Sequence, residues 1–534
     1  MARPLALAAT LVASLLAVSG AGGASAQTPK RGGTIVLAWP SFLEPPCLNV
    51  FVERCLGARG FAAEVLEGAF EFGPDDTYRP NLAEATFTTK PPFTIVYHIR
   101  PDARWSDGVP ITARDFVFTR QALRKVDPDN FHVTDVRSIR VLDAKTVEVV
   151  LRARLGRWRQ LFSVVLPQHA LVGEDFSSTW TDRIDNPKSG ESIASGPFLV
   201  DFERGKQLSL VRNRRYWGSH LAHLDRVRFE FRTGTGTADE SLRAGASNMA
   251  MGSVVPGQVT EFRSIPGIRV VLARGPGFDH LLVRVGAGGH PALRNKLVRR
   301  ALAYGIDRVG VVRALWGDAL PALGPLDSLV LLSQSRYYRP NWSAYRYRPA
   351  QARRLLQQAG CSEGADGIYV CAGQRLSLRL ASTPQTRRLR ATPLIQADLR
   401  RAGIEVKPQL ASPAVVEQQI IPSGEYDLAF VEGAYAVPDT VLPSLVFRCM
   451  GQLNFTGYCQ RLVTRDLEQS TRILDAERRA RALNRADAQM AGDVPVIPLY
   501  AVPIYVAARS KMRGVIPSFP PQMAWNAENW WLAE

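Results

Sequence analysis

The 534-residue sequence contains few lysines and no clustered basic segment. Only 9 of its 66 basic residues are lysine, and the arginines are spread along the whole chain without a basic run or interleaved aromatic residues. A nucleic-acid surface would concentrate such charge on one segment or face. The net charge of +17 therefore does not predict a nucleic-acid partner. The arginine bias, together with abundant alanine and glycine, is typical of a GC-rich genome.

The sequence also lacks the motifs of common catalytic and cofactor sites. It contains no G-x-S-x-G, H-E-x-x-H, Walker loop or paired-carboxylate motif, and Gly234-Thr-Gly236 lacks the third glycine of a dinucleotide site. His220 and His223 have metal-compatible spacing, but no third ligand stands near them in sequence, which favours surface histidines. We therefore expect no enzyme, no cofactor and no metal.

No apolar stretch of transmembrane length follows the N-terminal segment. Residues 1–26 have the pattern of a secretory signal peptide: Arg3, an apolar core from Leu5 to Val18, and the small residues Ala24-Ser25-Ala26. We predict cleavage after Ala26. No cysteine stands directly after the apolar core to carry a lipid anchor, so we expect a protein exported to the periplasm in soluble form.

The six cysteines fall in three local pairs. The pairs are Cys47 with Cys55, Cys361 with Cys371, and Cys449 with Cys459. An even number of cysteines in an exported chain predicts disulfides, each contributing on the order of 3 kcal/mol for a loop this short. Free buried thiols are the alternative. A zinc site is disfavoured because no C-x-x-C motif occurs.

Periodicity predicts a mixed α/β protein. Residues 31–39 are predicted to be a loop that runs into a short apolar strand. Further predicted strands cover residues 93–100, the two halves of 136–151 joined at Asp143-Ala144, a segment opening at Ser195-Gly196, residues 404–406 and residues 495–500. Predicted helices cover residues 61–70, 113–123, 295–315, 349–359, a segment ending at Ala402, and 462–490. In the second of these, Thr112 is the predicted N-cap and Asp115 an acid in the first turn.

One segment carries more than secondary-structure information. The run R-W-S-D-G-V-P-I-T-A-R-D-F-V-F-T-R-Q-A-L from Arg104 to Leu123 resembles the "W-x-D-G-x-P-h-T-A-x-D-V-x-F" segment of family 5 bacterial solute-binding proteins. These are the oligopeptide-, dipeptide- and nickel-binding receptors of ABC importers. Further segments resemble family elements in the family's order. They are P-N-L-A-E at 80–84, S-G-P-F at 195–198, R-N-R-R-Y-W-G at 212–218, V-R-R-A-L-A-Y-G-I-D-R at 298–308, A-R-R-L-L-Q-Q-A-G at 352–360 and D-V-P-V-I-P-L-Y at 493–500.

The resemblance implies an α/β, two-lobed periplasmic-binding-protein fold of type II, in the large cluster with an extra α+β front subdomain. A small solute, peptide or peptide-like, would be enclosed between the lobes by hinge closure and delivered by a monomer to an ABC permease in the cytoplasmic membrane. The predicted division is 1–26 signal peptide, 27–60 lobe I, 61–185 front subdomain, 186–270 lobe I, 271–494 lobe II and 495–534 lobe I.

The family's ligand segment is altered in this sequence. Peptide-binding relatives have "G-W-x-A-D-x-P-D-P", where a tryptophan forms a wall and an aspartate binds the peptide's ammonium group. Here Pro438-Asp439 keeps the register, but the tryptophan position holds Gly433 and the aspartate position Ala436. Either Glu432 and Tyr435 replace the two side chains from neighbouring positions, or the ligand has no free ammonium, as in an opine, a sugar or another small solute. For Glu432 a solvated loop charge is the alternative.

Other candidate ligand contacts are Trp39 and Phe42 after the first strand, Arg284 after an apolar strand, and Asp439. For Trp39 a place in the core is the alternative. Arg284 could bind a carboxylate in bidentate fashion, and a surface ion pair explains it equally well. No catalytic residues are predicted. The rival hypotheses are a secreted hydrolase and a sensory or chaperone-like receptor on the same fold.

Overall fold

A computed structural model describes most of the chain. The described residues are 28–39, 47–52, 55, 58, 60–73, 77–203, 207–231, 237–317, 323–434, 442–517 and 524–534. The predicted signal peptide and the loop at Gly234–Gly236 lie outside these ranges. No helix in the described part of the chain is both long and apolar enough to cross a bilayer.

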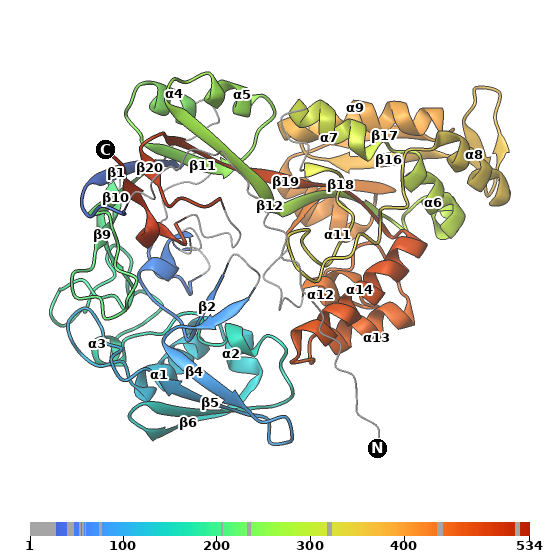
Figure 1. Cartoon of the computed structure of the whole chain (residues 1–534). Coiled ribbons are helices and arrows are strands. Elements are labelled where there is room, and N and C mark those ends of the chain that lie inside the picture. Colours follow the sequence, from blue (N-terminus) through green and yellow to red (C-terminus); the bar gives the residue numbers. More distant parts are fainter. Residues whose placement is uncertain are drawn as a thin grey trace, which may run out of the picture.

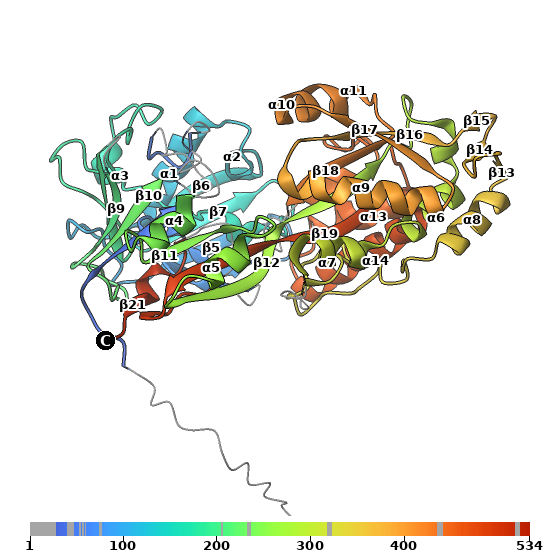
Figure 2. The same ribbon diagram turned by 90° about the horizontal axis from the view of Figure 1, so that it is seen from above.

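A ten-stranded mixed sheet runs through the whole molecule (Figure 1). In spatial order its strands are β17 (Glu405–Leu410), β16 (Ser377–Ser382), β18 (Leu428–Ala434), β12 (Ile268–Val283), β19 (Val496–Arg509), β11 (Met249–Ser253), β1 (Thr34–Trp39), β10 (Arg226–Phe231), β9 (Gln207–Arg212) and β8 (Phe198–Glu203). The two longest strands, β12 and β19, pair antiparallel and extend from one half of the molecule into the other (Figure 2). Their pairing shifts register between Arg274 and Phe278, where one bulged segment joins the halves.

The first half contains β1 and β8–β11 and carries a separate four-stranded antiparallel sheet. That sheet has the order β4 (Ala83–Phe87), β5 (Thr94–Ile99), β7 (Thr146–Leu151), β6 (Val136–Asp143). The helices of this part are α1 (Ala113–Val126), α2 (Phe131–Thr134), α3 (Gln168–Leu171), α4 (Thr237–Arg243) and α5 (Gln258–Arg263). Two short strands, β2 (Phe70–Phe72) and β3 (Tyr78–Pro80), pair beside them, and β20 (Met512–Arg513) pairs with β21 (Trp531–Leu532).

The second half surrounds β16, β17, β18 and the far ends of β12 and β19. Its helices are α6 (Lys296–Tyr304), α7 (Arg308–Trp316), α8 (Pro349–Gln358), α9 (Thr386–Arg401), α10 (Pro413–Val415), α11 (Ile421–Ser423), α12 (Leu442–Phe447), α13 (Arg461–Ser470) and α14 (Ala476–Asp493). Helices α7 and α9 lie on one side of the sheet and α12 to α14 on the other (Figure 1). A small hairpin sheet, β13 (Ser362–Glu363), β14 (Tyr369–Cys371) and β15 (Gln374–Arg375), stands at the far end.

Two buried apolar clusters fill the molecule, and the larger extends from the second half into the first, where it includes residues of α4 and α5. One gathers residues such as Trp105, Leu208 and Val506, and the other residues such as Leu281, Leu428 and Tyr500. Strand β19 contributes to both clusters. The long strands β12 and β19 thus run from one half of the molecule into the other, in keeping with the two-lobed architecture that the sequence predicts.

Local signals in the sequence predict several elements correctly. Thr112 and Asp115 form a capping box at the start of α1: Thr112 Oγ1 accepts from Arg114 N, and Asp115 Oδ2 accepts from Thr112 N at 2.7 Å. All three predicted cysteine pairs form disulfides, with Cα separations of 5.0 Å, 4.4 Å and 4.5 Å. The middle disulfide brackets the antiparallel pair of β13 and β14, as its glycine-rich turn predicts.

Three helix predictions are wrong in their extent. The predicted helix 295–315 is two helices, because α6 ends at Gly305 and Asp307 caps α7 by accepting from Gly310 N at 2.9 Å. Val309, which a single amphipathic helix over 295–315 would place on the apolar face, is 41% exposed. The predicted helix 462–490 is likewise divided, since Asp475 caps a new helix, α14.

Residues 61–70 contain only a short 3₁₀ turn at Ala62–Glu64. Distant backbone groups fix the rest of this segment: Ala69 N donates to Phe162 O at 2.8 Å, and Glu67 O accepts from Val165 N at 3.1 Å. Tertiary hydrogen bonds therefore override the helical spacing of the sequence.

Candidate functional site

The parallel strands of both halves end toward the middle of the β12–β19 pair. In the first half, β1 runs parallel to β10 and β11, and β11 ends where Ser253 pairs with Ile504 of β19. In the second half, β18 runs parallel to β16 and ends where Ala434 pairs with Gly277 of β12. Ligands of open α/β sheets bind outside the carboxyl ends of such strands. The geometry therefore places the candidate site between the two halves. On the second half, this site is bordered by the ends of β16 and β18 and by the start of α9, which together we call the interlobe edge.

A charged cluster forms this interlobe edge. Asp279, on β12, is fully buried and accepts from Arg387 Nε at 2.6 Å, from Arg388 Nη2 at 3.1 Å and from the Tyr500 hydroxyl at 3.0 Å. Arg388 also donates to Thr383 Oγ1 at 2.7 Å and lies over the ring of Phe430. A buried carboxylate that receives this many donors holds both guanidinium groups in place. We call Asp279, Arg387, Arg388, Tyr500 and Glu432 the paired cluster.

Glu432 is the exposed end of the paired cluster. Its side chain is 40% exposed, and its Oε2 accepts a short hydrogen bond from Arg387 Nη2. Burial lowers the pKa of Arg387, but Asp279 and Glu432 outweigh that effect, so its pKa is raised and the guanidinium stays charged. The other carboxylate oxygen of Glu432, Oε1, lies so close to Gly277 that a Cβ added to this glycine would stand 2.2 Å from it. Oε1 accepts no hydrogen bond from the described residues. One carboxylate oxygen thus remains available at the interlobe edge.

Two rings of β12 cover Gly433, the residue at the family's tryptophan position. A Cβ at Gly433 would stand 2.7 Å from Phe278 Cζ and 3.1 Å from His280 Cε1. The ring centroids of Phe278 and His280 are 5.1 Å apart, and both side chains are buried. Burial lowers the pKa of His280 to about 4, with Arg388 acting in the same direction and Asp279 against it. The rings of Phe278 and His280, which belong to the neighbouring strand β12, therefore fill the space that a side chain at position 433 would need. Only glycine fits at this position.

The other predicted contact residues lie in different surroundings. Trp39 is 2% exposed and packs against Phe229 and Phe231, with ring centroids 5.2 Å and 6.1 Å away. Arg284 donates to Ala287 O at 2.7 Å and to Phe455 O at 2.6 Å, so its guanidinium joins two loops of the second half. Phe42, Tyr435 and Asp439 lie outside the described residues. Their predicted roles stay predictions.

The sequence reasoning missed four members of the paired cluster: Asp279, Arg387, Arg388 and Tyr500. A signal was present, because an aspartate stands inside the apolar strand G-F-D-H-L-L-V and two arginines stand together at the start of a helix. Their meeting depends on the pairing of β12 with β18 and on the place of α9, which the sequence alone does not fix. Within the described ranges, no group of three or more His, Cys, Asp and Glu side chains is arranged to hold a metal ion.

Comparison with known proteins identifies the class. The family model described as bacterial extracellular solute-binding proteins, family 5 Middle, matches residues 77–448. Over 516 residues the chain is 27% identical to the oligopeptide-binding protein OppA of Mycobacterium tuberculosis, covering 91% of this chain and 82% of the relative.

Two solved structures show the same fold. A periplasmic EDTA-binding protein, EppA, superposes with a TM-score of 0.82 at 22% identity, covering 95% of this chain and 98% of the other. The oligopeptide-binding protein AppA of Bacillus subtilis, in complex with a nonapeptide, superposes with a TM-score of 0.70 at 20% identity, covering 95% and 100%.

The chain belongs to family 5 of the bacterial extracellular solute-binding proteins. It is a solute-binding receptor of an ABC import system, which captures a small solute between its two lobes and delivers it to a membrane permease.

Proposed function

We propose that the solute is a peptide or peptide-like molecule whose positively charged group is bound by Glu432. The observation that carries this proposal is that Oε1 of Glu432, at the interlobe edge, accepts no hydrogen bond from the described residues, while the Arg387 guanidinium holds the other oxygen. A buried ammonium group needs a counter-charge, and the family's aspartate position holds Ala436 in this chain. Glu432 supplies a carboxylate four residues earlier.

Two observations support a peptide ligand. The relative that aligns with 91% of this chain is an oligopeptide-binding protein, and the structural neighbour AppA was solved with a nonapeptide. We also propose that Tyr435, Asp439, Trp39, Phe42 and Arg284 contribute contacts, with Tyr435 as the aromatic partner of the ligand.

A solute rich in carboxylates is the second candidate. The neighbour with a TM-score of 0.82 is an EDTA-binding protein, and Arg387 at the interlobe edge stays charged. If such a ligand displaced Glu432 from Arg387, the guanidinium would bind a ligand carboxylate in bidentate fashion. The two candidates differ in which partner of the Arg387–Glu432 pair the solute contacts.

Identification of the released solute tests the proposal. The protein is purified without refolding and denatured, and the small molecules released are measured by mass spectrometry. Short peptides, followed by calorimetric binding that acetylation of the peptide's amino terminus weakens about tenfold or more, about 1.4 kcal/mol, would support the proposal. Release of polycarboxylates, with no peptide and no effect of acetylation, would overturn it.

We further propose that the protein works as a non-enzymatic monomer in the periplasm, after cleavage at Ala26 and without a lipid anchor. The lobes would divide near residues 270 and 495, the boundaries that the family resemblance implies. N-terminal sequencing of the exported protein should begin at Gln27, and light scattering should give the mass of one chain. A lipidated cysteine at the amino terminus or a stable dimer would contradict these points.

A further inference from the structure

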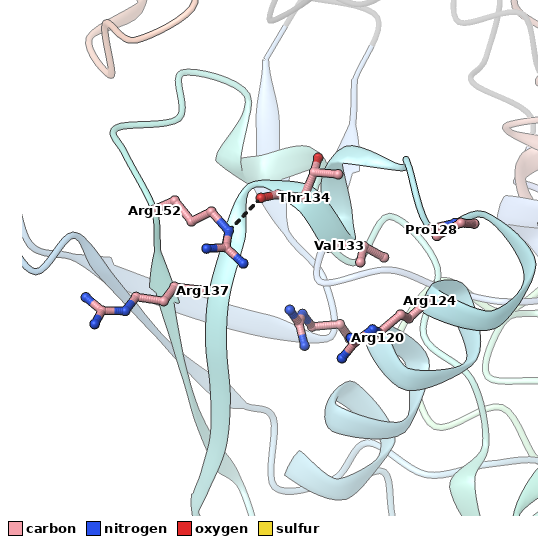
Figure 3. Close-up of a pocket in the computed structure, with 7 residues that line it drawn as sticks. All are labelled: Arg120, Arg124, Pro128, Val133, Thr134, Arg137 and Arg152. Carbon is pink, nitrogen blue, oxygen red and sulfur yellow. Dashed lines mark hydrogen bonds between the residues drawn. The ribbon is translucent and has the colours of Figure 1, made fainter.

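A cavity in the part of the molecule formed by α1, α2, β6 and β7 is lined mostly by arginine. Its volume is about 410 Å³, and it is separate from the interlobe edge. The lining residues are Arg120, Arg124, Pro128, Val133, Thr134, Arg137 and Arg152 (Figure 3). We call it the arginine cavity. Nothing in the transport function described above uses it.

No carboxylate offsets the charge of the arginine cavity. Acidic side chains are absent from its lining, and none of its four arginines forms an ion pair with another described residue. Burial lowers the pKa of Arg120, and Arg124 and Arg152 lower it further. Arg120 and Arg124 stand four residues apart on α1, the spacing at which like charges repel on a helix face.

Backbone carbonyls hold two of the guanidinium groups without using all their donors. Arg120 Nη2 donates to Val136 O at 2.9 Å, and Arg152 Nε donates to Thr134 O at 3.0 Å. Arg120 Nε is buried and has no hydrogen-bond partner among the residues that the structure describes. In Figure 3, Arg120 and Arg124 come from α1 and Arg152 from the facing wall, whereas Arg137 points away from the other three. The centre of the cavity is therefore formed by Arg120, Arg124 and Arg152.

We propose that the arginine cavity binds a phosphate-type oxyanion, either free or as the headgroup of an anionic lipid. Guanidinium groups match the oxygen geometry of phosphate through paired N–H donors, and three of them converge here from two walls of one cavity. A bound dianion would satisfy the remaining donors and replace repulsion among like charges by attraction. The inference is independent of the solute bound between the lobes.

Binding of inorganic phosphate to the full chain tests the proposal. Calorimetry at low ionic strength, where exposed charges are least screened, compares the wild type with the double variant Arg124→Gln, Arg152→Gln. The matched control is Arg313→Gln, Arg400→Gln, which removes the same charge from exposed positions on α7 and α9. We expect phosphate binding by the wild type, a Kd raised about tenfold or more in the cavity variant, and no change in the control. Thermal unfolding checks that both double variants fold.

A second measurement distinguishes a free oxyanion from a lipid headgroup. The same three proteins are sedimented with vesicles of phosphatidylcholine containing phosphatidylglycerol and with vesicles of phosphatidylcholine alone. Binding to the anionic vesicles that the cavity variant loses and the control keeps would identify the headgroup as ligand; phosphate binding without it would identify the free oxyanion. If the cavity variant matches the control with both probes, the proposal is overturned.

Discussion

The two arginine clusters of this protein differ in what balances their charge. In the paired cluster, Arg387 and Arg388 face the buried carboxylate of Asp279, and Arg387 reaches Glu432 as well. In the arginine cavity, the groups that act on Arg120 are other arginines and backbone carbonyls. One cluster is neutral without a ligand and helps to hold β12, β19 and α9 together. The other has charge left over.

This difference separates a structural use of arginine from a binding use. A guanidinium whose donors are taken by buried carboxylates contributes to folding and is costly to disturb. A guanidinium among like charges at a half-open cavity contributes little to folding and has donors left for a ligand. Glu432 stands between these cases, because it is bound to the paired cluster on one side and exposed on the other.

The largest effect should come from Asp279→Ala. The substitution leaves two buried guanidinium groups and the Tyr500 hydroxyl without their acceptor, and we expect a loss of about 3–5 kcal/mol in the free energy of unfolding. Denaturant unfolding measures it. Glu363→Ala, which breaks the exposed pair with Arg353, is the control and should cost less than about 1 kcal/mol. Equal losses in the two variants would remove the distinction between a buried and an exposed pair.

His280 should give the second largest effect, as a dependence of stability on pH. Its pKa is lowered to about 4 in the folded protein from an ordinary value of 6.5, so the unfolded chain binds the proton more readily. The contribution of neutral His280 to the free energy of unfolding is fully present above pH 6.5 and is lost as the pH falls toward 4. At about 1.4 kcal/mol per pKa unit, the loss amounts to up to about 3 kcal/mol. The variant His280→Asn should show a smaller loss than the wild type over this range. Parallel pH curves for the two proteins would show that His280 is not buried in its neutral form.

The smallest effect should come from Arg124→Gln in the arginine cavity. Removing one of two like charges four residues apart on α1 should raise the free energy of unfolding by about 0.2–0.5 kcal/mol at low salt. The gain should vanish at high salt, where the repulsion is screened. Denaturant unfolding at two salt concentrations measures it. A clear loss of stability would mean that Arg124 has a partner in the folded protein, and the contrast between the clusters would fail.

Local signals in the sequence predict much of the fold. The capping box at Thr112, the cysteine pairs and the strand 136–143 followed by 146–151 depend on residues close together in the chain. The family segments predict the two-lobed architecture. The undivided helices 295–315 and 462–490 were wrong, because the capping roles of Asp307 and Asp475 were not recognised.

The sites depend on contacts that local patterns do not contain. Glu432 could be named from the family register, but its partner Arg387 lies 45 residues away and Asp279 a further 108. The arginine cavity brings together residues of α1, β6 and the segment after β7. Because these segments are apart in the chain, nothing in the sequence distinguishes its four arginines from the many others. Only the folded chain shows which arginines have carboxylate partners.

The most direct test of the solute site is the affinity of Glu432→Gln for the peptide that the protein itself releases. Glu363→Gln is the matched control, since it removes a half-exposed carboxylate from an arginine pair at the far end of the second half. Titration calorimetry should give a Kd about tenfold or more higher for Glu432→Gln, about 1.4 kcal/mol, and an unchanged Kd for Glu363→Gln. Equal affinities of the two variants would contradict binding of the solute by Glu432.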